Sequence, residues 1–193
     1  MPTRDDLVDL FTQSGALLEG HFRLSSGLHS AAYLQCALVL SDPKAAQQLG
    51  QLLGEKVGGL GANVVLSPAL GGVVIGHEVG RALGVRALFA ERVDGVLTLR
   101  RGFMLGPADR VLVVEDVLTT GGSTRETMDV ARAAGAQIVG AASIVDRSGG
   151  TARFDVPFQA LLPIEVTAYQ PDACPLCAKG LAVVKPGSRP TSA

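Results

Sequence analysis

The chain is poor in cysteine, carries no excess of one charge and contains no long hydrophobic run. Its 193 residues include 17 basic and 18 acidic side chains, a net charge of −1, so the basic surface typical of nucleic-acid-binding proteins is missing. No window approaches the roughly 18 continuous apolar residues of a membrane span. The first residues, with acids at Asp5 and Asp6, lack the pattern of a signal peptide. We therefore expect no nucleic-acid partner, no membrane attachment and a cytoplasmic location.

The cysteines, Cys36, Cys174 and Cys177, are too few and odd in number for a disulfide framework. Cys174 and Cys177 have the spacing of half a zinc site, but such a site needs four ligands, and the sequence shows no second pair. We expect two ordinary thiols in a turn of the tail; the alternatives are zinc shared across a dimer, or a redox pair. His29 and His77 are expected to be structural histidines.

Composition and periodicity predict one α/β domain. Hydrophobic residues make up 47% and charged residues 18% of the chain, which favours a sizeable core and disfavours disorder. Short apolar runs predict strands, and amphipathic runs predict helices. The expected strands are 31–40, 63–67, 86–90, 111–115, 138–145 and 158–164; the expected helices are 5–14, 42–57, 73–83 and 125–134. A polar loop at 91–95 leads to a hairpin arm at 96–100. The alternation indicates a parallel sheet with helices on both faces.

Residues 111–124 form the most informative stretch. An apolar strand ends at two adjacent acids, Glu115 and Asp116, and a turn of Thr, Gly and Ser follows at 119–123. In such sheets ligands bind at the carboxyl ends of the strands. The turn offers backbone N–H groups, hydroxyls and a helix N-terminus, which suit a phosphate. The carboxylates suit paired hydroxyls, as on a ribose. A sugar phosphate would bind the turn through its phosphate and the carboxylates through its hydroxyls.

Other interpretations of this stretch are weaker. The sequence contains no P-loop motif (Gly-x-x-x-x-Gly-Lys-Ser/Thr). No dinucleotide-binding Gly-x-Gly-x-x-Gly follows a strand either. The structural alternative is that Glu115 and Asp116 only cap the next segment and the glycines only turn the chain. Adjacent acids at a buried strand end are costly without a partner, so we favour a binding site.

The stretch VVEDVLTTGGS at 113–123 resembles the phosphoribosyl pyrophosphate (PRPP) motif of type I phosphoribosyltransferases. Three flanking segments resemble those of the orotate phosphoribosyltransferases: FRLSSGLHS at 22–30, SPALGG at 67–72 and IVDR at 144–147. The ending CPLC at 174–177 is similar to that of some bacterial members. The resemblance covers about residues 17–166.

The resemblance implies an enzyme that joins orotate to PRPP, giving orotidine 5′-monophosphate and pyrophosphate in pyrimidine synthesis. It implies one domain over 1–193, with a core at about 41–150, a hood at about 1–40 and 151–185, and a mobile tail at 186–193. Magnesium would arrive with PRPP and have no direct protein ligand. A homodimer is expected. The alternatives are a relative that uses a purine or xanthine, and a non-catalytic regulator that senses PRPP.

The resemblance also implies roles for individual residues. Those for PRPP are Glu115, Asp116, Val117, Leu118, Thr119, Thr120, Gly121, Gly122 and Ser123. Those of the pyrophosphate loop are Ala69, Leu70, Gly71 and Gly72, and those for orotate are Ser25, Thr119 and Arg147. Asp116 and Arg92 would be catalytic. Arg92 lies in the equivalent of a mobile basic loop, with Arg100 and Arg101 nearby, and could equally be a solvated arginine. Ser25 and Gly71 stand where many members carry lysine.

Overall fold

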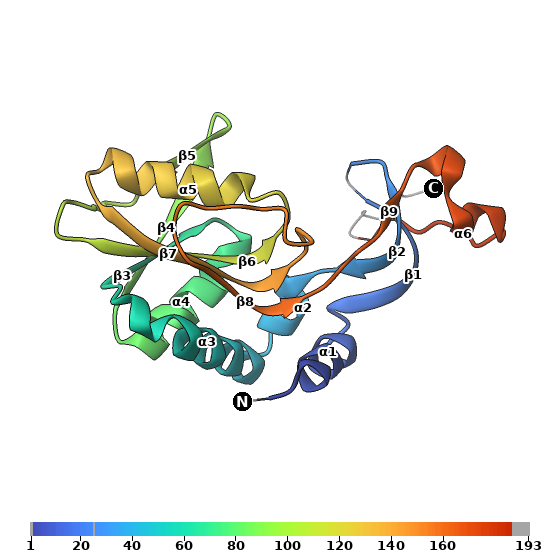
Figure 1. The fold of residues 1–193 in the computed structure, drawn as a ribbon, viewed down its shortest axis with the longest axis horizontal. Helices are drawn as coiled ribbons and strands as arrows, with labels where there is room; N and C mark the ends of the chain where they lie inside the picture. The colour runs from blue at the N-terminus through green and yellow to red at the C-terminus, as the bar shows by residue number, and fades with distance from the viewer. Residues whose placement is uncertain (1, 25, 187–193) are drawn as a thin grey trace.

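A computed structural model describes residues 2–24 and 26–186, which contain two β-sheets (Figure 1). The large sheet has the order β5-β4-β3-β6-β7-β8, and only the β4–β5 pair is antiparallel. Its strands are β3 (Val64–Pro68), β4 (Arg86–Val93), β5 (Val96–Leu99), β6 (Arg110–Leu118), β7 (Gln137–Asp146) and β8 (Phe158–Pro163). The predicted parallel α/β architecture is confirmed.

Helices cover both faces of the large sheet. In Figure 1, α5 (Gly122–Ala133) lies above the sheet, and α3 (Pro43–Val57) and α4 (Gly71–Leu83) lie below it. Successive strand residues point to opposite faces, so Leu112 of β6 packs into the core between the sheet and helices α3 and α4, and Val113 packs into the core between the sheet and α5. Strands buried on both faces explain the continuous apolar runs of the sequence.

Local signals set the helix ends. The Asp42 carboxylate accepts a hydrogen bond of 2.9 Å from the Lys44 N–H, and Pro43 is the first residue of α3. Gly84 ends α4 with a φ of +68°, a conformation that favours glycine. Helix α5 begins at Gly122, three residues earlier than expected, because Gly121 at φ +78° turns the chain into it.

The small sheet, which we call the hood sheet, joins both ends of the chain. It has the order β1-β2-β9, all antiparallel. Its neighbouring Val184 exchanges two backbone hydrogen bonds of 2.8 Å with His21 and Arg23. Figure 1 shows the blue N-terminal hairpin beside the red C-terminal segment, away from the large sheet. The remaining elements are α1 (Arg4–Gln13), β1 (Leu17–Arg23), β2 (His29–Leu34), α2 (Cys36–Leu40), η1 (Gly58–Leu60), β9 (Ala168–Tyr169), η2 (Pro171–Ala173) and α6 (Pro175–Ala178).

Several boundaries differ from the sequence prediction. The strand expected at 31–40 ends at Leu34 and gives way to α2, because periodicity does not distinguish a short buried helix from a strand. Residues 158–163, expected in the hood, form the edge strand β8 of the large sheet, paired with β7. Residues 187–193 of the expected mobile tail lie outside the described part of the chain. Among the described residues no helix combines the length and hydrophobicity needed to span a bilayer.

The prediction of a polar loop at 91–95 is wrong. Strand β4 continues to Val93, and a two-residue turn at Asp94 (φ +50°) and Gly95 (φ +86°) leads directly into β5. Two central residues with positive φ are characteristic of a type I′ hairpin turn, for which Asp-Gly is a preferred sequence. The hairpin arm expected at 96–100 is confirmed as β5 (Val96–Leu99), and the prediction overlooked only the Asp-Gly turn that leads into it.

Candidate active site

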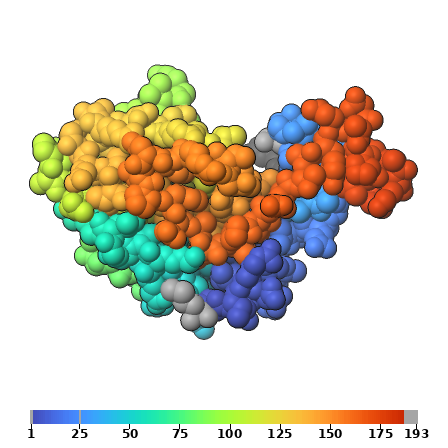
Figure 2. Space-filling model, in the orientation of Figure 1, coloured from blue at the N-terminus to red at the C-terminus, as the bar shows by residue number. Residues whose placement is uncertain are grey.

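Three connections meet at the carboxyl edge of the large sheet. They follow β3, β6 and β7, whose parallel pairing places their ends on one side. A cavity of about 240 Å³ lies there. It is lined by residues of the loop after β3, the two adjacent acids, Arg92 and two neighbours: Pro68, Ala69, Gly71, Gly72, Arg92, Leu97, Glu115, Asp116 and Ser123. Figure 2 shows a wide notch that separates the large sheet and its helices from the hood.

Glu115 faces α5. Its buried carboxylate accepts a hydrogen bond of 2.5 Å from the Ser123 hydroxyl and another from the Thr124 hydroxyl. Burial raises the pKa of Glu115, and the two hydroxyl bonds lower it in part. Glu115 therefore fixes the first turn of α5 against β6. Thr124 was missed by the sequence prediction, although a hydroxyl in the first helical turn after two acids was a usable signal.

Asp116 faces the opposite side, toward α4. A Cβ atom added at Gly71 would lie 2.7 and 2.8 Å from the two Asp116 carboxylate oxygens. Burial raises the pKa of Asp116. Besides the first cavity, Asp116 lines a second one of about 360 Å³, whose other residues come from α2 and α4 and the segments beside them: Gln35, Ala37, Leu40, Ser41, Leu70, Gly71 and Val74. Asp116 thus stands between two cavities.

The turn at 119–121 is open. Thr119 and Thr120 are exposed, and no hydrogen bond within the described chain uses the backbone N–H groups of residues 119–121. Arg125 donates to the Thr120 carbonyl oxygen at 2.9 Å and holds the turn from outside. By contrast, the side chains of Val117 and Leu118 are half-buried and buried, respectively, so they contribute packing.

Arg147 stands at the end of β7. Its backbone N–H donates to the Leu118 carbonyl oxygen at 2.8 Å, which joins the ends of β7 and β6. Its buried Nε has no hydrogen-bond partner among the described residues. Burial lowers the pKa of Arg147. Burial raises the pKa of the Cys36 thiol. The Asp116 carboxylate raises the same pKa further, and the Arg147 guanidinium lowers it in part. Asp116 and Arg147 therefore both lie near the Cys36 thiol. Ser25 lies outside the described residues.

Arg92 reaches the first cavity from β4. Its guanidinium forms an ion pair of 2.8 Å with Glu126 on α5 and donates to the Gly95 carbonyl oxygen at 2.6 Å. Arg92 is thus held at the site by two contacts. Glu126 was missed because it comes from a helix 34 positions further along the chain. Arg101 is turned toward Glu91, with two hydrogen bonds of 2.7 Å across the hairpin.

The sequence interpretation also found no second pair of ligands to accompany Cys174 and Cys177, and this is wrong. The ring nitrogens of His21 and His29 and the two sulfur atoms all lie within 4.8 Å of one another. The histidines come from the hairpin β1–β2, about 150 positions before the cysteines, so the spacing alone did not reveal them. His77 lies elsewhere, exposed on α4.

The fold and the strand-end site are those of a phosphoribosyltransferase, and residues 39–170 match the family model described as "Phosphoribosyl transferase domain". The orotate phosphoribosyltransferase of Carboxydothermus hydrogenoformans is 54% identical over 186 residues, 95% of this chain and 97% of that protein. The crystal structure of the enzyme from Aeropyrum pernix has a TM-score of 0.68 at 25% identity, covering 82% of this chain and 93% of that one. The Mycobacterium tuberculosis enzyme in complex with PRPP shares the fold, with a TM-score of 0.65 at 24% identity over 84% and 96% of the chains. The chain belongs to the orotate phosphoribosyltransferase family.

Proposed function

We propose that the chain transfers the ribose 5-phosphate group of PRPP to orotate, releasing pyrophosphate and giving orotidine 5′-monophosphate in the de novo synthesis of UMP. The observation that carries the proposal is the placement of Asp116, the turn at 119–123 and Arg147 at the carboxyl ends of the neighbouring parallel strands β6 and β7. These groups suit the ribose, the phosphate and a carboxylate-bearing base. The 54% identity to a curated relative over nearly the whole chain supports the same activity.

The turn at 119–123 is proposed to hold the 5′-phosphate. No hydrogen bond within the described part of the chain uses the N–H groups of residues 119–121, and the turn opens the twelve-residue helix α5. A helix N-terminus carries unsatisfied N–H groups and a partial positive charge, which favour an anion. Glu115 and Asp116 are proposed to accept hydrogen bonds from the ribose hydroxyls. In that state Glu115 would share its oxygens between the ribose and the Ser123 and Thr124 hydroxyls.

Arg147 is proposed to grip the carboxylate of orotate. A guanidinium presents paired N–H donors that match a planar carboxylate. Its buried Nε lacks a partner among the described residues, and a buried donor without an acceptor costs free energy that a bound carboxylate removes. Thr119 is exposed one residue after Leu118, whose carbonyl oxygen binds the Arg147 backbone, so its hydroxyl is a second candidate contact. Ser25 completes the proposed set.

The pyrophosphate loop offers no side-chain cation, because Ala69, Leu70, Gly71 and Gly72 are uncharged. We therefore assign charge neutralisation to Mg²⁺ carried by PRPP, to backbone N–H groups and to Arg92, which lines the same cavity. As pyrophosphate leaves, positive charge develops on the ribose ring. The Asp116 carboxylate, fixed beside the loop, would stabilise that charge without reorganising.

The proposal includes a homodimer, a cytoplasmic location and no nucleic-acid or membrane partner. The hairpin β4–β5, which carries Arg92, exposes Val93 and Val96, with fractional exposures of 37% and 65%. Apolar side chains at an exposed hairpin tip favour contact with a second copy. The near-neutral charge of the chain disfavours electrostatic binding to nucleic acid.

A base-selection assay tests the proposal. The protein is mixed with Mg²⁺, PRPP and orotate, adenine or xanthine in separate reactions, and loss of free base is followed. We expect turnover with orotate only, and none after chelation of Mg²⁺. Turnover with adenine or xanthine alone would identify another base. Binding of PRPP without turnover of any base would indicate a regulator.

A further inference from the structure

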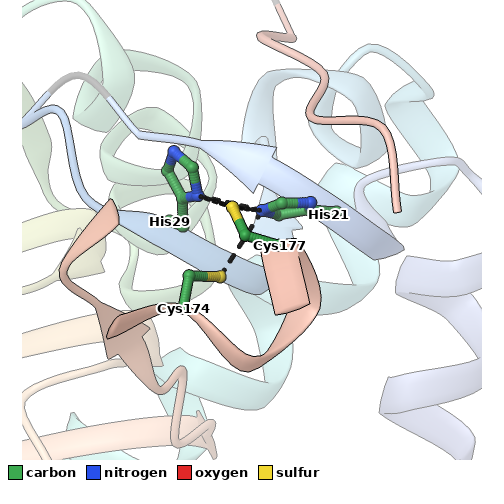
Figure 3. Close-up of side chains that lie close together, drawn as sticks. All are labelled: His21, His29, Cys174 and Cys177. Atoms are coloured by element: carbon green, nitrogen blue, oxygen red, sulfur yellow. Dashed lines mark hydrogen bonds between the residues drawn. The ribbon is translucent and has the colours of Figure 1, made fainter. Parts of the chain in front are cut away.

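Four metal-binding side chains converge in the hood, outside the candidate active site. Figure 3 shows His21 from β1, His29 from β2, and Cys174 and Cys177 from the start and end of the α6 turn, all pointing toward one another. His21 Nε2 lies 2.9 Å from His29 Nδ1, 3.5 Å from Cys174 Sγ and 3.8 Å from Cys177 Sγ. Cys177 Sγ lies 3.3 Å from His29 Nδ1.

Hydrogen bonding alone does not account for this arrangement. His21 Nδ1 lies 2.8 Å from the Leu181 carbonyl oxygen, which can only accept, so this nitrogen carries the proton. Nε2 of the neutral ring is then left with a single lone pair. Three atoms approach it, from His29, Cys174 and Cys177. One lone pair cannot serve three donors, whereas a cation among the four atoms would use a lone pair from each.

The separations fit a tetrahedral zinc ion. Bonds of about 2.0–2.1 Å to nitrogen and about 2.3 Å to sulfur give ligand-to-ligand distances of about 3.3 Å for N···N and about 3.6 Å for N···S. The N···N distance is 2.9 Å, three of the four N···S distances are 3.3, 3.5 and 3.8 Å, and the remaining separations are within 4.8 Å. Two thiolates with two imidazoles are a typical structural zinc set. The Leu181 carbonyl supplies the outer hydrogen bond that orients a ligating histidine.

We propose that His21, His29, Cys174 and Cys177 bind one structural zinc ion that fastens the C-terminal segment to the β1–β2 hairpin. All four positions are filled by protein groups, which leaves no open position for a substrate. The hood sheet needs such a fastening, because β9 has only two residues and Val184 adds a single bridge. A two-stranded hairpin such as β1–β2 is marginally stable by itself. The zinc proposal does not rest on the proposed orotate activity.

Metal analysis of the purified full-length protein tests the proposal. We expect about one zinc ion per chain, and below about 0.1 per chain in Cys174→Ser, Cys177→Ser, His21→Gln and His29→Gln. The chain supplies matched controls: Cys36→Ser and His77→Gln remove the third cysteine and the third histidine, and both should keep the metal. Apoprotein loaded with Co²⁺ should show thiolate-to-cobalt charge transfer and the visible bands of tetrahedral cobalt.

Several outcomes would overturn the zinc assignment. Wild-type protein that stays metal-free after incubation with Zn²⁺ would do so, as would full zinc content in the Cys174→Ser and Cys177→Ser variants. A Cys174–Cys177 disulfide in freshly purified protein, detected by mass spectrometry, would favour a redox pair instead. If a ligand variant fails to fold, chelation of the wild type followed by Zn²⁺ addition remains decisive, because thermal stability should fall and then recover.

Discussion

Replacing Gly71 with alanine should destabilise the fold and slow the reaction together, because the added methyl group meets the carboxylate of Asp116. The Cβ atom would lie 2.7, 2.8 and 2.9 Å from Oδ1, Oδ2 and Cγ of Asp116. Overpacking of a tight site costs about 1–3 kcal/mol, and the better helix propensity of alanine offsets up to about 1 kcal/mol. A net loss of about 1–2 kcal/mol corresponds to a fall in Tm of about 2–8 °C for a chain of this size.

Thermal unfolding and steady-state kinetics would measure the two effects of Gly71→Ala. Gly59→Ala is the matched control, since a Cβ there meets nothing within 4 Å. In the double variant Gly71→Ala with Asp116→Ala the clash is gone, so the stability losses should not add, with a coupling of about 0.5–3 kcal/mol. Activity should stay low in the double variant. A Gly71→Ala protein with unchanged Tm and turnover would refute the reasoning.

Further substitutions separate the roles at the site. Arg147→Ala should raise the KM for orotate by roughly 100-fold and leave that for PRPP nearly unchanged; equal losses for both would contradict the assignment. Asp116→Asn should lower kcat without lowering Tm, because burial raises the pKa of Asp116 and the fold therefore disfavours its ionised form; an unchanged kcat would count against the ribose contact. Arg92→Ala should lower kcat/KM for PRPP by about 100-fold, whereas Glu126→Gln, which breaks a half-exposed ion pair, should alter stability by less than about 1 kcal/mol. As the pH is lowered, kcat/KM should begin to fall above the pH range in which ordinary carboxyl groups titrate, because the pKa values of Glu115 and Asp116 are both raised. A kcat/KM that stays constant down to the ordinary carboxyl range would contradict this prediction.

The sequence predicted the core sheet because its determinants are local. Apolar runs such as 111–114 are continuous where a strand is buried on both faces, and Gly84 and Pro43 mark helix ends directly. The convergence of Asp116 and Arg147 also followed from topology, because parallel strands carry their carboxyl ends to one edge. Residues at the ends of core strands could therefore be predicted from the sequence.

What the sequence did not reveal depends on contacts between distant segments. The opposite orientations of Glu115 and Asp116 place one against α5 and the other against Gly71, and only packing shows which partner each receives. The ion pair of Arg92 with Glu126 joins a strand edge to a helix. The four zinc ligands lie in two pairs at opposite ends of the chain, so no local spacing describes them.

The hood sheet has a consequence for the way the protein is made. Strands β1 and β2 are translated before the large sheet, but their partners β9 and Val184 are translated after it. The large sheet can assemble once β8 has emerged, whereas the N-terminal hairpin must wait with an unpaired edge. A nascent chain that ended before Cys174 would therefore contain every strand of the large sheet but lack Val184 and both cysteines of the hood.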